Sequence, residues 1–225
     1  PTDSLKSEIT ITQLLSHSGG LMHGLEQNPV QIRFRNGYFK PGIKTIQERV
    51  ANMTKYPLLA QPGTEWNYSA GPDVLCVLIE KFSGMSVNEF VKSRILDPLE
   101  MKHTGYNVPK EEQSKIVALH TKGKNGTISV AANQPPYENV TVWSGVNGLF
   151  STAADYATFC QMMMAGGTYK GKQYLSRKTV ELMTSNHTGD LFPTPGTEWG
   201  LGFAVVTDGP ATKTPASKGL FYWGG

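Results

Sequence analysis

A phenol and a hydroxyl stand side by side where one loop of this chain runs into a helical pattern. In residues 62–84, PGTEWNYSAGPDVLCVLIEKFSG, Tyr68 and Ser69 follow Trp66 and directly precede an apolar run. Two interpretations of the tyrosine are open. It is either a core residue at the start of a helix or a group that transfers protons, which requires its pKa to be lowered from about 10.

The rest of the chain lacks the spacings that by themselves activate a nucleophile. There is no G-x-S-x-G elbow, and no serine has a lysine three positions later, so Ser-x-x-Lys is also absent. HExxH and CxxC do not occur, and the five histidines are scattered. No metal site and no cofactor is therefore predicted.

Composition excludes several classes of function. Apolar residues make up 39% and charged residues 17% of 225 residues, as in proteins with a hydrophobic core. The net charge of +3 contains no basic run for nucleic acid, and no apolar stretch is long enough for a membrane span. Cys76 and Cys160 lie in apolar helical patterns typical of buried cysteines. Their pairing, the oligomeric state and the compartment stay open.

Periodicity and turn residues predict an α+β protein in which the helices come first. Helices are expected at 9–17, 43–53, 69–82, 87–96, 152–164 and 176–184, and strands at 116–121, 127–132, 199–207 and 219–223. Loops are expected at 20–42, 102–115, 133–145 and 186–198. In the strongest helix, Val74, Leu78 and Phe82 share an apolar face.

Four segments resemble a known family in order and spacing. ITITQLLSHSGGL is similar to ITIRQLLTHTSGL of the β-lactamase-related serine hydrolases, which include class C β-lactamases, DD-peptidases and family VIII esterases. The stretch from Pro62 resembles their PGT-x-x-x-YSN segment, and GVNGLFSTAADYATFCQMMMAGG resembles GGLFSTAADYARFAQMLLNGG. YWGG matches the Trp-Gly-Gly of the esterase branch. The resemblance implies one β-lactamase/DD-peptidase domain over residues 1–225, incomplete at both ends.

The resemblance gives Tyr68 a catalytic role. It is similar to the family tyrosine that moves a proton between the nucleophilic serine and the leaving group. In the family, a lysine one helical turn after that serine supplies the positive charge that a tyrosine base needs. The serine and lysine lie upstream of the segment that resembles residues 9–21, so these 225 residues alone are expected to lack covalent catalysis.

Departures from the family pattern bear on the substrate. Ala70 stands where the family has Asn, and a methyl group offers no hydrogen bond. Trp223, Gly224 and Gly225 stand where Lys-Thr-Gly presents a cation. An indole offers an apolar face and one N–H group, which favours a neutral ester over an anionic substrate. The backbone N–H of the oxyanion hole is expected at about the residue after Gly225.

The remaining candidates have competing interpretations. Asn147 either faces the cleft or belongs to a turn, and His17 resembles a family histidine that is usually structural. His187-Thr188-Gly189 mimics the Lys/His-Thr-Gly motif, but it follows a helix directly and is interpreted as a turn in which the histidine favours the helix dipole.

Three functions follow as hypotheses. The first is a carboxylesterase that acts through an acyl-enzyme on a small ester or amide. The second is a β-lactamase or D-alanyl peptide hydrolase. The third is a non-catalytic binding module that keeps the scaffold, and the reading frame upstream of Pro1 distinguishes it from the others.

Overall fold

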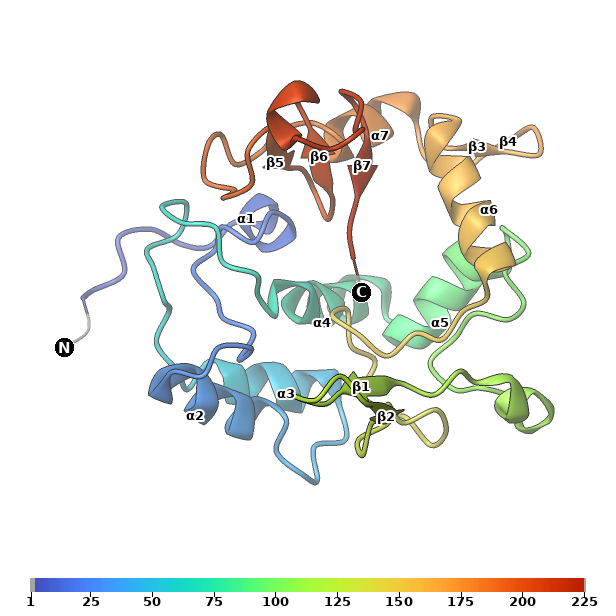
Figure 1. Ribbon diagram of the computed structural model, residues 1–225, viewed down its shortest axis with the longest axis horizontal. Coiled ribbons are helices and arrows are strands. Elements are labelled where there is room, and N and C mark those ends of the chain that lie inside the picture. Colours follow the sequence, from blue (N-terminus) through green and yellow to red (C-terminus); the bar gives the residue numbers. More distant parts are fainter. Residues whose placement is uncertain (1–2, 225) are drawn as a thin grey trace.

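In the computed structural model, which describes residues 3–224, a helical layer lies beside a small antiparallel sheet (Figure 1). The helices are α1 (Ile11–Leu15), α2 (Pro29–Tyr38), α3 (Ile46–Met53), α4 (Gly71–Ser83), α5 (Val87–Val91), α6 (Ala153–Met164) and α7 (Arg177–Met183). A π-helical segment, Lys92–Leu96, continues α5, and 3-10 turns occur at Lys110–Lys115 and Pro210–Thr212.

The strands form three separate antiparallel sheets within the described residues. They are β1 (His120–Lys122), β2 (Ile128–Val130), β3 (Thr168–Tyr169), β4 (Lys172–Gln173), β5 (Thr197–Trp199), β6 (Ala204–Val206) and β7 (Phe221–Tyr222). β1 pairs with β2, β3 with β4, and β5, β6 and β7 form one three-stranded sheet in that order. The predicted α+β class is confirmed.

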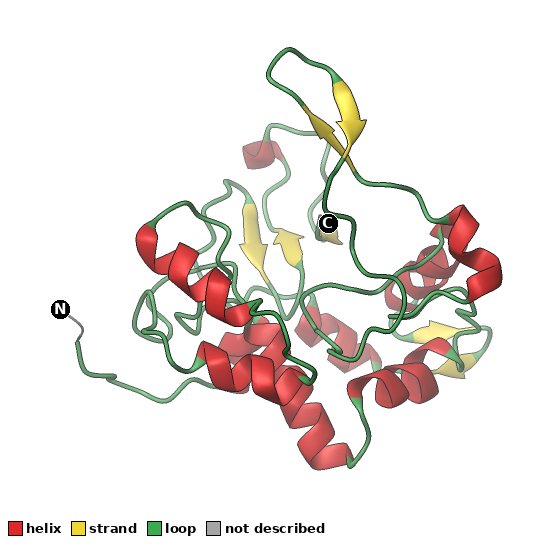
Figure 2. Ribbon diagram, turned by 90° about the horizontal axis from the view of Figure 1, so that it is seen from below, coloured by secondary structure: helices red, strands yellow, loops and turns green. Residues whose placement is uncertain are grey.

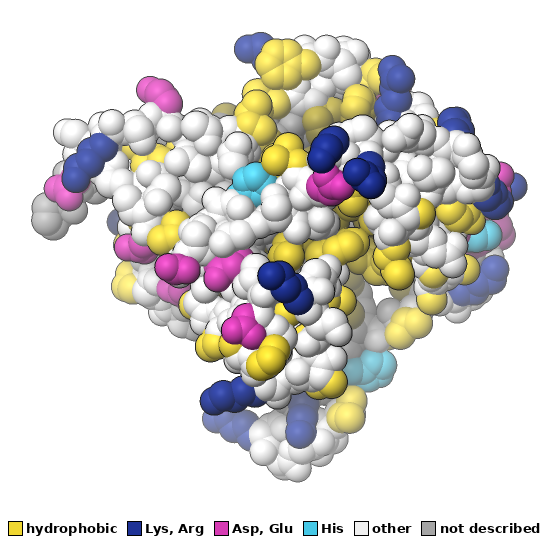
Figure 3. Space-filling view, turned by 90° about the horizontal axis from the view of Figure 1, so that it is seen from above, with side chains coloured by type: hydrophobic (Ala, Val, Ile, Leu, Met, Phe, Trp, Pro, Cys, Tyr) yellow, Lys and Arg dark blue, Asp and Glu magenta, His cyan; other side chains and the backbone are white. Residues whose placement is uncertain are grey.

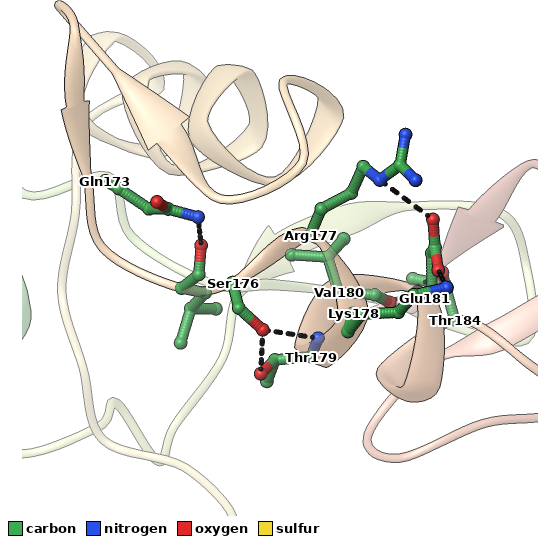
Figure 4. Close-up of polar contacts among 9 residues, drawn as sticks. Gln173, Ser176, Arg177, Lys178, Thr179, Val180, Glu181 and Thr184 are labelled. Atoms are coloured by element: carbon green, nitrogen blue, oxygen red, sulfur yellow. Dashed lines mark hydrogen bonds and ion pairs between the residues drawn. The ribbon is translucent and has the colours of Figure 1, made fainter.

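Side-chain caps explain why most helices begin where the sequence predicts. Thr152 accepts a hydrogen bond from the Asp155 N–H group at the start of α6. Ser176 accepts one from the Thr179 N–H group at the start of α7 (Figure 4). Such caps satisfy backbone donors that have no partner within the helix. α4 has no side-chain cap, and it ends at Gly84 in the left-handed conformation.

The prediction of a loop over residues 20–42 is wrong, because α2 lies within it. Asn28 caps this helix and Pro29 fills its first turn, where a missing N–H group costs nothing. The helix is mostly polar and so lacks a strong apolar period. Phe34 and Tyr38, four residues apart, nevertheless place one face in the core. These two aromatic side chains supply the burial that stabilises α2.

The single strand predicted at 199–207 is also wrong, because the chain turns back inside it. β5 ends at Trp199 and β6 begins at Ala204, and the intervening turn is closed by a hydrogen bond from the Gly200 N–H group to the Phe203 carbonyl oxygen. A Cβ at Gly200 would lie 2.3 Å from a backbone oxygen of α7. β5 also occupies the end of the loop predicted at 186–198.

The buried face of α4 differs from its most apolar face. Gly71, Asp73 and Cys76 are the buried residues, whereas Phe82 is 78% exposed. Burial is therefore greatest at the beginning of the helix, where polar groups from other segments converge on it.

The hairpin of β1 and β2, predicted from the Asn-Gly turn, is present and projects from the body of the molecule (Figure 2). All six of its strand residues are exposed. On the face shown in Figure 3, basic and acidic side chains are interspersed with hydrophobic ones. Among the described residues, no helix combines the length and apolar character required to cross a bilayer.

Candidate active site

Tyr68 lies between the helical layer and the sheet, on the irregular segment that leads into α4. Its side chain is half-buried rather than sealed in the core. The ring centroid lies 4.8 Å from that of His17, 5.2 Å from that of His23 and 5.5 Å from that of Trp223. The phenol is thus packed on several sides by aromatic groups while part of it remains accessible.

His17 accepts hydrogen bonds from the backbone on both sides of Tyr68. Its Nδ1 accepts a hydrogen bond from the Ser69 N–H group at 3.2 Å and lies 3.0 Å from Ser69 Oγ. Its carbonyl oxygen accepts from the Asn67 N–H group. These contacts hold the residues on both sides of Tyr68, which supports the structural interpretation of this histidine.

Both histidines beside the phenol favour the neutral state. Burial, with a smaller contribution from His23, lowers the pKa of His17 to about 4. Burial also lowers the pKa of His23, an effect that the Asp73 carboxylate opposes. Because neither imidazole carries a charge at neutral pH, neither supplies the positive field that a catalytic tyrosine requires.

The sheet brings the terminal tryptophan to this position. Trp223 follows β7 directly and packs edge-to-face on Trp199 of β5 with ring centroids 4.4 Å apart. Trp199 is fully buried, and its indole Nε1 donates to the Leu15 carbonyl oxygen of α1. The hydrogen bond from Trp199 connects the sheet to α1. The position of the sheet in turn places the indole of Trp223 beside Tyr68.

A buried carboxylate that sequence reasoning missed organises the other side of α4. Asp73 is fully buried, and its Oδ1 accepts from Ser144 Oγ at 2.7 Å and from the Gly145 N–H group at 2.8 Å. Its Oδ2 accepts from the Tyr38 hydroxyl and lies 3.8 Å from Arg49 Nη1. The position was detectable as a single charge inside an apolar run, because charges are rarely buried unless paired.

The predicted site residues do not all meet at one place. Ala70 is fully buried among apolar side chains, so its methyl group lines no accessible surface in this structure. Asn147 is exposed and lines a cavity to which neither Tyr68 nor Trp223 contributes. Gly224 is exposed at the end of the described chain, and Gly225 lies outside the described residues.

His187 occupies the turn after α7, as its sequence context indicates. Its Nε2 lies 2.8 Å from the Leu182 carbonyl oxygen in the last turn of that helix. Thr188 accepts a hydrogen bond from the Trp199 N–H group, which ties the turn to β5. Both side chains thus have structural partners. No cluster of three metal-ligating side chains occurs among residues 3–224.

Solved structures place this fold in a known class. The hydrolase EstCE1, described as having promiscuous acyltransferase activity, superposes with a TM-score of 0.72 at 22% identity. The match covers 93% of this chain and 59% of that one. The fold is thus that of the β-lactamase and penicillin-binding-protein class, as the sequence predicts.

The chain belongs to the β-lactamase family, because the family model described as "Beta-lactamase" matches residues 1–225. An uncharacterised protein of Mycobacterium tuberculosis is 29% identical over 100% of this chain and 59% of its own length. A putative D-alanyl-D-alanine carboxypeptidase of Escherichia coli is 27% identical over 96% of the chain and 51% of its own length. Esterase EstB of Burkholderia gladioli is 25% identical over 99% and 61%.

The relatives include one protein with a peptidase name and one with an esterase name, and both names describe hydrolases. Membership in a hydrolase family is therefore supported by both relatives. The chain spans between half and about three fifths of the length of these curated relatives.

Proposed function

We propose that this chain forms the larger part of a carboxylesterase of the β-lactamase family, with Tyr68 as its proton shuttle. The observation that carries the proposal is the position of the half-buried phenol between the sheet-borne Trp223 and the imidazoles of His17 and His23. The phenol is accessible, and its backbone is held on both sides.

The proposed reaction uses a serine and a lysine that lie outside residues 1–225. The serine hydroxyl loses its proton to the Tyr68 phenolate as its oxygen attacks the ester carbonyl carbon. Tyr68 then gives that proton to the departing alkoxide, which leaves an acyl-enzyme and an alcohol. Water attacks the acyl group through the same shuttle and releases the acid.

The neutral histidines make the lysine necessary. A phenol with a pKa near ~10 acts as a base at neutral pH only when a cation stabilises its ionised form. Because His17 is neutral at pH 7, the cation must come from another group. We infer that residues 1–225 alone do not hydrolyse esters.

Trp223 supports an ester with a neutral acyl group. Its indole is 41% exposed beside Tyr68 and presents an apolar face where a cation would bind a substrate carboxylate. Apolar surface favours the hydrocarbon part of a substrate. Short-chain nitrophenyl esters are suitable first substrates.

The test compares Tyr68→Phe with wild type in the complete protein, using nitrophenyl butyrate. Loss of a general acid–base group lowers the rate by about 10²–10⁴-fold. Tyr156→Phe is the matched control, because Tyr156 is an exposed tyrosine on α6 and its change is expected to leave the rate intact. Equal rates for the Tyr68 variant and wild type would remove Tyr68 from the mechanism.

The Escherichia coli relative gives a specific reason to test a second function, D-alanyl peptide or β-lactam hydrolysis. A labelled penicillin reports it, because acylation leaves the label on the protein. With Trp223 in place of a cation, we expect labelling of the complete protein to be slow. Rapid, stoichiometric labelling would favour the second function over the esterase.

A further inference from the structure

A cavity that is separate from the surroundings of Tyr68 lies between α3 and the loop that precedes α6. It has a volume of about 640 Å³, within the range of small-molecule sites. Most of its walls are apolar, including Phe39, Ile43, Val140 and Phe150. Amide groups come from two asparagines, and the single ionised side chain on its walls is that of Arg49.

Arg49 is held in place but has hydrogen-bonding capacity to spare. Its side chain is 15% exposed, and its guanidinium carbon lies 5.3 Å and 5.4 Å from the ring centroids of Tyr38 and Phe39. Its ion pair with Asp73 is long, at 3.8 Å, and Asp73 already accepts three shorter hydrogen bonds. The Nε–H group of Arg49 is fully buried and unpaired, so the exposed remainder of the side chain is what an anion in the cavity can meet.

Arg49 lines the cavity with the part of its side chain that remains exposed, and an anion in the cavity would meet the guanidinium there. A guanidinium is a planar donor that matches a carboxylate with two parallel hydrogen bonds. The apolar walls match a hydrocarbon tail. No acidic side chain lines the cavity, and the carboxylate already paired with Arg49 is that of Asp73 at 3.8 Å.

We propose that this cavity binds an apolar organic acid, with its carboxylate at Arg49 and its hydrocarbon tail against Phe39, Ile43 and Val140. The ligand class is that of a medium-chain aliphatic or aryl acid. This inference goes beyond the proposed esterase function, because binding at Arg49 requires neither Tyr68 nor turnover.

Calorimetric titration of the complete protein with octanoate and with octanamide tests the proposal. The two probes share a tail, and only octanoate carries the charge. We expect octanoate to bind about ten-fold more tightly or better, which is the preference that a charge-assisted hydrogen bond confers. Arg49→Gln is expected to abolish the preference and to leave octanamide binding unchanged. Arg33→Gln, at an exposed arginine on α2, is the control and is expected to retain it.

A second variant covers the case in which Arg49→Gln does not fold, since Arg49 also faces Asp73. Thr141 is exposed and lines the cavity, so Thr141→Trp fills the space from the surface. It is expected to weaken both probes while leaving unfolding unchanged. Equal affinity of wild type for octanoate and octanamide would overturn the proposal, as would absence of saturable binding or octanoate affinity unaffected by Thr141→Trp.

Discussion

The contact between His17 and the backbone beside Tyr68 makes stability depend on pH in a defined direction. His17 is 5% exposed, and burial lowers its pKa to about 4 from an ordinary value near ~6.5. In the folded protein its Nδ1 must stay unprotonated, because it accepts the Ser69 N–H group. Unfolding releases this histidine to bind a proton at its ordinary pKa.

The sign follows from the two pKa values. Well above pH 6.5 the histidine is neutral in both states and contributes no pH dependence. As the pH falls from 6.5 toward 4, the unfolded state binds a proton that the folded state resists, so the free energy of unfolding decreases. With the pKa lowered to about 4 in the folded state, this residue alone reduces the free energy of unfolding by about 2 kcal/mol between pH 7 and pH 4.5.

The substitution that isolates this effect is His17→Asn. His17 has a positive φ of 56°, and asparagine tolerates that conformation better than most residues. The asparagine side-chain oxygen also accepts a hydrogen bond but does not titrate. The difference in unfolding free energy between wild type and His17→Asn should therefore fall by about 2 kcal/mol from pH 7 to pH 4.5.

Denaturant titrations of the complete protein at half-unit pH steps measure this difference. His120→Asn changes an exposed histidine on β1 and is expected to keep the wild-type pH profile. A wild-type-minus-variant difference that stays constant between pH 7 and pH 4.5 would show that His17 is not the buried neutral acceptor of the Ser69 N–H group.

Three further outcomes are expected. Asp73→Asn should destabilise the fold by about 3–5 kcal/mol in denaturant titrations, because it removes a fully buried charge that faces several donors. The control Asp97→Asn, at an exposed site, should change stability by less than about 0.5 kcal/mol. Gly145→Ala should destabilise by about 1–3 kcal/mol, because its Cβ would lie 2.7 Å from a backbone oxygen of α4. Burial raises the pKa of the Cys76 thiol to about 12, so at pH 8 Cys160, which is less buried, should react first with a thiol reagent followed by mass spectrometry.

Helix caps, a helix-stopping glycine and a turn dipeptide could be identified from neighbouring residues in the sequence alone. The caps at Thr152 and Ser176 and the stop at Gly84 lie in the sequence next to the helices they bound, so each could be identified without tertiary information. The Asn-Gly dipeptide likewise indicated the β1–β2 hairpin from local sequence.

Elements whose stability comes from distant partners were not predicted. α2 is polar over most of its length, and two buried aromatic residues, Phe34 and Tyr38, provide its burial. The turn between β5 and β6 depends on the close approach of Gly200 to the end of α7. Neither cause lies within the segment itself, so period and propensity alone misassigned both.

The candidate site shows the same contrast between residues that local sequence identifies and residues that only folding brings together. Tyr68 was identified because its neighbours in sequence match a family motif. The residues that hold it, His17 and Trp223, are 51 positions before it and 155 after it. Asp73 lies within the motif-bearing segment itself, yet its importance arises from Tyr38 and Ser144, which only folding brings to it. The segment at the start of α4 thus combines a half-buried phenol with a fully buried carboxylate. A substitution that shifts this turn is therefore expected to disturb catalysis and stability together, whereas Tyr68→Phe should disturb catalysis alone.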